Sequence, residues 1–82
     1  MTANGTIKVY GTQWCGDCFR AKQLMDKHDI RYDWTDIDDH PEFQQLVQSL
    51  NNGSTIVPTI VFPDGSHLSE PTDAELIEKL AI

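Results

Sequence analysis

Apolar and polar residues alternate with two different periods along the first half of this chain. Residues 6–10 alternate one by one and are rich in β-branched side chains, which predicts a strand. From about residue 16 to residue 28 the period becomes that of a helix. The apolar face of this helix is formed by Ala21, Leu24, Met25 and His28. Residues 31–37 again have strand character, so a parallel, right-handed βαβ unit is predicted. Ile37 breaks the alternation set by Tyr32 and Trp34, so the pattern does not predict whether Trp34 is buried or exposed.

The second half of the chain contains another helical stripe and a longer apolar run. A capping Asp39 followed by Pro41 predicts the start of a helix, and Gly53 suits a left-handed residue beyond its end. The stripe between them is Phe43, Leu46, Val47 and Leu50. Residues 56–62 form an apolar run typical of an interior strand. Pro58 must stand at the first residue of that strand, because proline cannot donate to a ladder.

The last twenty residues predict a turn, a short strand and a capped helix. Residues 63–66 combine Pro, Asp and Gly as a turn requires, and residues 67–68 return as a short antiparallel strand. Thr72 and Glu75 form a capping box at the start of the last helix. The predicted order is therefore β-α-β-α-β-β-α, which defines an α/β fold class.

Length and charge limit the kinds of function to consider. Eighty-two residues suffice for one domain, expected to span residues 1–82 with residues 1–5 flexible. The net charge of -7 argues against a nucleic-acid partner, which needs a basic surface. No apolar stretch approaches about 20 residues and no signal peptide is evident, so we expect no membrane association and a cytoplasmic location.

The only two cysteines, Cys15 and Cys18, stand at the start of the first predicted helix. In a reducing cytosol such a C-x-x-C pair is more often catalytic or metal-binding than structural. Cys15 would face unpaired backbone N–H groups and the positive end of the helix dipole, which favour the reactive thiolate. Cys18 would point inward and resolve a mixed disulfide on Cys15. Zinc needs four ligands and the three histidines show no paired spacing, so no metal site is predicted.

Several neighbours of the cysteines are expected to influence the reaction. Gly16 permits close approach of the backbone, Arg20 favours the thiolate, and the carboxylate of Asp17 opposes it. Trp14 and Phe19 are candidates for contact with a partner. Single exposed apolar residues are also normal, so ordinary exposure is the alternative for both.

The chain resembles the glutaredoxins of the thioredoxin fold over nearly all of its length. The resemblance is carried by the Trp14-to-Cys18 motif after a strand, by residues 57–59, by the Asp64-Gly65 hairpin and by the capped final helix. Within that family it is most similar to the mycoredoxins, which serve actinobacteria that use mycothiol. This resemblance implies a four-stranded mixed sheet, with the first and last helices on one face and the second helix on the other.

The resemblance also implies where substrate would bind. In this fold the Val57-Pro58 peptide bond is cis and lies beside the nucleophile, which leaves the backbone of Val57 free to pair with an extended substrate. The residues expected to bind substrate are Gln13, Trp14, Val57, Pro58, Ser69 and Thr72.

Departures from the family pattern concern the small thiol. Many members that bind glutathione have a cation where this chain has Thr12 and another where it has Thr55, and Glu70 adds charge of the wrong sign. A standard glutathione pocket is therefore not expected. Mycothiol, a sugar-based thiol without glutathione's carboxylates, is the favoured co-substrate.

The predicted function is reduction of protein disulfides or protein–mycothiol mixed disulfides. We expect a monomer without a bound cofactor whose partners are proteins carrying disulfides and a small thiol, with a NADPH-dependent reductase as a further candidate. One alternative is an electron donor to ribonucleotide reductase, recycled by thioredoxin reductase. Another is a dimer that binds a [2Fe–2S] cluster, which Gly16 permits.

Asp17 generates a direct test, because its carboxylate should disfavour a thiolate at Cys15. At the same pH, Asp17→Asn should therefore react faster with iodoacetamide at Cys15 than the unmodified protein does. The measurement is the alkylation rate over a range of pH. An equal or slower rate in the variant would contradict the expectation.

Overall fold

The strand that follows the N-terminal residues lies at the centre of the sheet. The computed structural model describes residues 6–82, so the predicted flexibility of residues 1–5 lies outside the described part. β1 (Ile7–Gly11) pairs in parallel with β2 (Tyr32–Asp36) and antiparallel with β3 (Thr59–Val61). β3 pairs antiparallel with β4 (His67–Ser69), which gives the strand order β2-β1-β3-β4. The predicted mixed sheet of four strands and the parallel first pair are confirmed.

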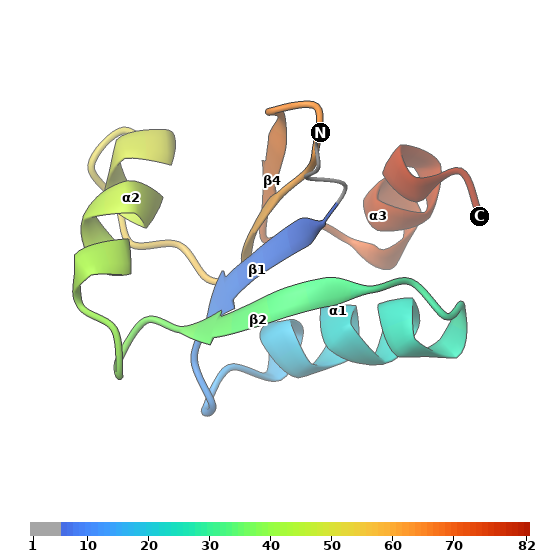
Figure 1. Cartoon of the computed structure of the whole chain (residues 1–82), viewed down its shortest axis with the longest axis horizontal. Helices are drawn as coiled ribbons and strands as arrows, with labels where there is room; N and C mark the ends of the chain where they lie inside the picture. Colours follow the sequence, from blue (N-terminus) through green and yellow to red (C-terminus); the bar gives the residue numbers. More distant parts are fainter. Residues whose placement is uncertain (1–5) are drawn as a thin grey trace.

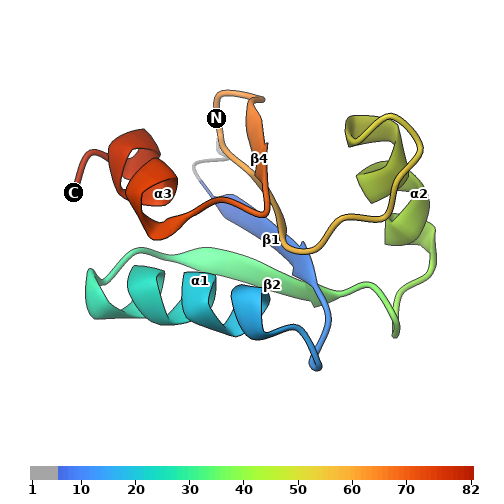
Figure 2. The ribbon, with the colours of Figure 1, turned by 180° about the vertical axis from the view of Figure 1, so that it is seen from behind.

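Three helices cover the two faces of this sheet. α1 (Gly16–Lys27) and α3 (Asp73–Leu80) contact each other, whereas α2 (Glu42–Leu50) stands apart from both (Figures 1 and 2). Residues from α1 and α3 join one apolar cluster with alternate residues of β1, and α2 joins a second cluster. The first cluster contains Ile7, Val9, Ala21, Met25, Ile60, Phe62 and Leu76, and the second contains Tyr10, Ile37 and Val47. The predicted element order and distribution of helices are therefore confirmed.

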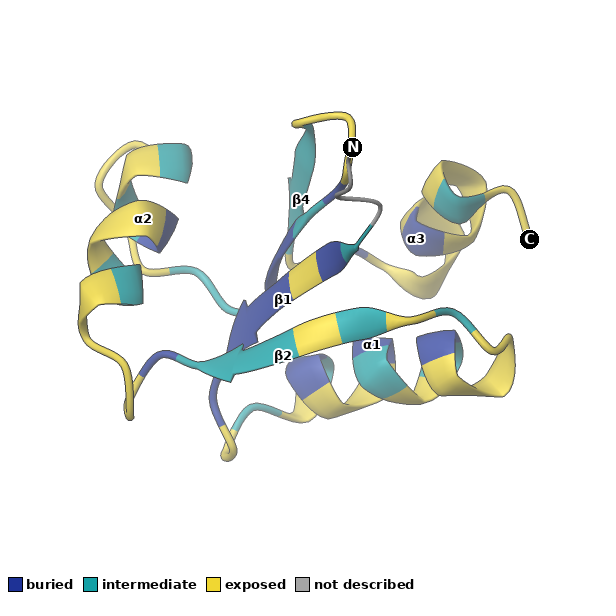
Figure 3. Ribbon diagram, in the orientation of Figure 1, coloured by how far each residue is buried: buried dark blue, intermediate teal, exposed yellow. Residues whose placement is uncertain are grey.

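Burial follows the two faces of β1. Figure 3 shows buried positions along β1 and on the inner sides of the helices. Ile7 and Val9 alternate with the exposed Lys8, while Tyr10 packs with Val47 on the opposite side. Burial of both faces explains why β1 occupies a central position. No described helix is both long and apolar enough to cross a membrane.

Some local predictions were wrong at the ends of the elements. Asp39 does not cap α2: the N-cap residue is Pro41, without a side-chain hydrogen bond. His28 is exposed at the end of α1 and does not continue the buried stripe. Ile37 lies just after β2 and packs in the second cluster, which explains its change of phase. Trp34 is partly buried against the first cluster.

The apolar run at residues 56–62 forms a shorter strand than predicted. β3 begins at Thr59, immediately after Pro58, so only three residues of the run pair as a strand. The Val57–Pro58 peptide bond is cis, as the resemblance implied. Gly65 has φ 90° in the following turn, where Asp64 accepts hydrogen bonds from the backbone N–H and hydroxyl of Ser66. These bonds, with help from Lys79, hold the pKa of Asp64 well below its ordinary value.

The predicted capping box at the start of α3 is present. The Thr72 hydroxyl accepts from the Glu75 N–H at 3.1 Å, and the Glu75 carboxylate accepts from the Thr72 N–H at 2.8 Å. Leu76, one residue later, is almost completely buried. The cap thus stabilises a helix that contributes to the main apolar cluster.

Thr72→Ala should lower the free energy of unfolding by about 1 kcal/mol, because one of the two capping bonds is lost. The measurement is urea denaturation followed by circular dichroism. Ser54→Ala, at an exposed position outside the helices, is the control and should change stability by less than about 0.5 kcal/mol. Equal losses in the two variants would show that the cap contributes nothing.

Candidate active site

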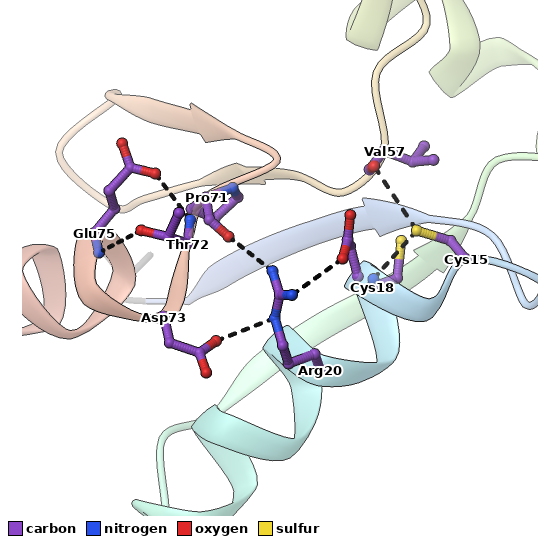
Figure 4. Close-up of polar contacts among 9 residues, drawn as sticks. Cys15, Cys18, Arg20, Val57, Pro71, Thr72, Asp73 and Glu75 are labelled. Carbon is purple, nitrogen blue, oxygen red and sulfur yellow. Dashed lines mark hydrogen bonds and ion pairs between the residues drawn. The ribbon is translucent and has the colours of Figure 1, made fainter.

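Cys15 is the N-cap residue of α1, and its sulfur meets polar backbone groups from two parts of the chain. Its backbone is extended (φ -89°, ψ 111°), and Sγ accepts a hydrogen bond from the Cys18 N–H at 3.2 Å. The thiol also lies 3.7 Å from the Val57 carbonyl oxygen, to which it can donate (Figure 4). A cap position of this kind provides N–H groups for a thiolate. The side chain is partly exposed, so a substrate can reach it.

Cys18, one turn into α1, occupies a different environment. Its exposed fraction is 1%, which confirms that it points inward. Burial, with a hydrogen bond to Cys15 as the second cause, raises the pKa of the Cys18 thiol to about 12. A backbone hydrogen bond from Thr12 and the charge of Lys22 oppose that rise in pKa. The two thiols of the motif therefore differ in access: one faces solvent and one the interior.

The segment around the cis bond is held against the start of α1. Pro58 is buried and its carbonyl oxygen accepts from the Glu70 N–H at 2.8 Å. Val57 is partly buried, and its carbonyl oxygen faces Cys15. The predicted proximity of Cys15 and Val57 is thus observed, although 42 residues separate them.

Arg20 does not point toward Cys15 but toward the start of α3. Its guanidinium contacts the carboxylates of Asp17 and Asp73, each at 3.2 Å, and donates to the Pro71 carbonyl oxygen at 3.4 Å (Figure 4). The charge of Asp17 is therefore partly balanced by Arg20. These bonds join the first turns of α1 and α3, and no hydrogen bond from Arg20 to Cys15 is present among residues 6–82.

The aromatic residues beside the motif are exposed. Trp14 is 73% exposed and Phe19 is 60% exposed. The Trp14 indole N–H donates to the Asp38 carboxylate at 3.0 Å, which connects the active-site turn to the loop after β2. Gln13 and Gly16 are exposed on either side of the cysteine. Trp14 is thus oriented by a hydrogen bond and still open to contact.

Ser69 and Thr72 form bonds within the fold. Ser69 donates to the side-chain oxygen of Asn51, and Asn51 in turn donates to Thr59. Thr72 caps α3. In the described part of the chain neither side chain forms a hydrogen bond with Cys15, so their predicted contact with substrate stays a prediction.

Two residues near the site were missed because their roles depend on distant neighbours. Asp38 was only one member of an acidic stretch, and nothing in its position predicted the bond to Trp14. From the sequence, Thr12 was considered only as a position where many glutathione-binding members have a cation. In the structure Thr12 is 3% exposed, and its hydroxyl has no hydrogen-bond partner among the described residues. Burial of Thr12 next to a strand end could not be deduced from periodicity.

The arrangement is suited to dithiol chemistry. An accessible sulfur at a helix N-terminus can attack a disulfide, and a buried thiol one turn later can displace the bound product. Within residues 6–82, no group of three or more His, Cys, Asp and Glu side chains is placed to hold a metal ion. Fold and site together define a dithiol oxidoreductase of the thioredoxin-like class.

Comparison with known proteins identifies the family to which the chain belongs. The model of the glutaredoxin family matches residues 7–68, and the chain belongs to that family. A protein assigned to the glutaredoxins in Mycobacterium tuberculosis is 39% identical over 74 residues, covering 90% of this chain and 88% of that protein. Mycoredoxin 1 of Corynebacterium glutamicum is 36% identical, covering 90% and 91%. The chain is thus a glutaredoxin-type thiol–disulfide oxidoreductase whose dithiol is Cys15 and Cys18.

Solved structures of glutaredoxins share the fold of this chain. The glutaredoxin of Archaeoglobus fulgidus superposes with a TM-score of 0.79 at 22% identity, covering 93% of this chain and 86% of that one. The glutaredoxin of Methanosarcina mazei gives 0.80 at 23% identity, covering 95% and 80%. At such identities the likeness supports the fold.

The two cysteines should differ in what their removal abolishes. Cys15→Ser should lose reductase activity toward every disulfide, because the accessible nucleophile is gone. Cys18→Ser should lose activity only toward protein disulfides and keep turnover of mixed disulfides that a small thiol can resolve. The measurement is reduction of each substrate class by the purified variants. Reductase activity retained in Cys15→Ser would refute the assignment.

Proposed function

We propose that this glutaredoxin reduces protein disulfides and protein–mycothiol mixed disulfides, with mycothiol as its preferred small thiol. The Cys15 thiolate attacks the substrate disulfide, forms a mixed disulfide and releases one thiolate. Cys18 then displaces the bound group and leaves a Cys15–Cys18 disulfide; alternatively, a second small thiol attacks and restores Cys15. Each cycle transfers two electrons to the substrate.

The observation that carries the preference for mycothiol is the charge around the site. The positions where glutathione-binding members have cations are Thr12, which is buried, and Thr55, which is exposed. Glu70 is exposed and left-handed (φ 48°), next to the buried Pro71. Two of the acids that flank the helix starts, Asp17 and Asp73, already share Arg20. Few cations therefore remain for the carboxylates of glutathione, whereas an uncharged sugar thiol needs none.

Sequence similarity supports the same preference. Mycoredoxin 1 of Corynebacterium glutamicum matches over nine-tenths of both chains. A Pseudomonas aeruginosa glutaredoxin also matches, at 30% identity over 73 residues. The mycoredoxin has a higher identity to this chain than the Pseudomonas glutaredoxin has. The charge pattern is an independent reason to choose mycothiol as the small thiol.

The surrounding residues have proposed roles in binding. The Val57 carbonyl and the backbone beside Pro58 pair with an extended substrate, while Trp14 and Gln13 contact it from the opposite turn. Gly16 borders open space beside Cys15, since no other atom lies within 4 Å of the position that a Cβ would take there. Arg20 affects the thiolate of Cys15 only indirectly, through its neutralisation of Asp17. Ser69 and Thr72 line the far side of the bound thiol.

The preference can be measured with the Cys18→Ser variant, which isolates the route through a small thiol. A peptide carrying either a mycothiol or a glutathione mixed disulfide is offered with the matching thiol, and kcat/KM is compared. We expect the mycothiol reaction to be faster by about tenfold, a difference of about 1.4 kcal/mol. Equal turnover, or faster turnover with glutathione, would overturn the proposal.

A charge variant tests the physical reason. Thr55→Lys places a cation at an exposed position and should raise kcat/KM for glutathione about two- to fivefold, the effect of an exposed ion pair of up to about 1 kcal/mol. The mycothiol reaction should stay within twofold of its original rate, and Thr55→Gln is the uncharged control. An equal gain for both thiols would refute the electrostatic explanation.

A further inference from the structure

Gly11, the last residue of β1, is buried at a point where no larger residue fits. A Cβ placed on it would lie 2.5 Å from Cys18 Sγ and 2.8 and 2.9 Å from two ring atoms of Trp34. Contacts under 3.0 Å force something to move. The φ of Gly11 is not among the positive values, so its backbone is open to any residue. Glycine is therefore required here for space, and the space is occupied by the sulfur of Cys18 and the indole.

Trp34 fills the other part of the space next to Gly11, and Lys22 lies over its ring. Trp34 pairs with Val9 in the β1–β2 ladder and is partly buried against the main apolar cluster. The ammonium of Lys22 lies 3.8 Å from the centroid of the Trp34 ring, within the range of a cation–π interaction. Lys22 stands four residues after Cys18 on α1, so the thiol and the cation share one face of the helix. The sulfur of α1 and the indole of β2 thus both lie against the backbone of Gly11, and Lys22 reaches the indole from α1.

The second step of the reaction is sensitive to such packing. Cys18 must reach the sulfur of Cys15 in line with the bond that breaks, and a misplacement of about 1 Å can cost two orders of magnitude in rate. Packed interiors transmit small changes of volume instead of absorbing them. Cys15, by contrast, is held by the Cys18 N–H and faces Val57 on the open side of the site. The surroundings of Cys18 can therefore control one step without controlling the other.

We propose that Gly11, Trp34 and Lys22 position the thiol of Cys18 for the intramolecular step, and that the attack by Cys15 does not depend on them. In this step the Cys18 sulfur bonds to Cys15 Sγ, the bond from Cys15 to the bound group breaks, and that group leaves as a thiolate. The proton of Cys18 passes to solvent or to the leaving thiolate. The inference rests on the dithiol route of the proposed function, but not on the choice of small thiol.

Stopped-flow reaction with dithiobis(nitrobenzoate) separates the two steps. Attack by Cys15 releases a first coloured thiolate in a bimolecular phase, and attack by Cys18 on the mixed disulfide releases a second in a unimolecular phase. Cys18→Ser defines the trace that lacks the second phase. No mycothiol or glutathione is present, so this result and the preference for mycothiol can fail independently.

Gly11→Ala should slow the second phase about tenfold or more, because the new methyl group displaces the sulfur, and leave the first phase within twofold. Trp34→Leu and Lys22→Met should slow the second phase less, by about two- to fivefold. The first removes the ring that shares the space at Gly11 with the sulfur, and the second removes the cation over that ring. Lys27→Met on the same helix and Lys8→Ala on β1 are matched controls and should change neither phase.

Three outcomes in the variants would overturn the proposal. The first is a second phase of unchanged rate in Gly11→Ala. The second is equal slowing of both phases in Gly11→Ala and Trp34→Leu, which would indicate general disturbance of the fold. The third is equal slowing of the second phase by Lys22→Met and Lys27→Met. Absence of the second phase in the unmodified protein would refute the dithiol route itself, and this proposal with it.

Discussion

Burial of both faces of β1 is the constraint on which the rest of this structure depends. Ile7 and Val9 join one apolar cluster and Tyr10 joins another, so helices must cover β1 on both sides. Strands pair with it along both edges, which satisfies its backbone groups away from water. β3 therefore lies beside β1, and the chain entering β3 passes the turn that leaves β1 (Figure 2). That turn carries Cys15, and the segment entering β3 carries Val57 and Pro58. The active site is assembled because the central strand requires these neighbours.

The chemistry then follows from unequal surroundings of two identical thiols. Cys15 lies at the N-terminus of α1, where the Cys18 N–H donates to its sulfur and solvent is near. Cys18 lies one turn further, against the sheet, where removal from water disfavours its charged form. The order of the reaction is thus determined by position along one helix. The close contact with Gly11 adds a geometric requirement to this electrostatic one.

Acidic side chains around the site are paired with neighbouring donors, which the net charge of -7 does not reveal. Arg20 joins Asp17 and Asp73 at the first turns of two helices, and Asp38 is occupied by Trp14. Exposed pairs of this kind contribute little to stability, so their main effect is on what approaches the sulfur. The consequence is a site with few unpaired cations, and the preference that we propose for an uncharged thiol rests on this arrangement.

The sequence by itself determined the elements whose signals are local. The capping box of Thr72 and Glu75 and the helix that starts at the two cysteines could be predicted because each depends on residues within a few positions. Pro58 was predicted as the first residue of its strand and lies one position before it. The glutaredoxin assignment, including the cis bond, came from resemblance of whole motifs. One local signal gave a wrong prediction. Asp39 is a residue type that often caps helices, but α2 starts later in the chain and its N-cap residue is Pro41.

Only the tertiary structure decided which side chains meet across the sheet. The direction of Arg20 toward α3, the bond of Trp14 to Asp38 and the burial of Thr12 depend on partners between 20 and 60 positions away or on enclosure by several elements. Gly11 is the clearest case, since nothing in the neighbouring sequence indicates which side chains lie against it. Its neighbours Cys18 and Trp34 come from α1 and β2. Periodicity shows which face of its own element a residue occupies, but not which residues of other elements pack against that face.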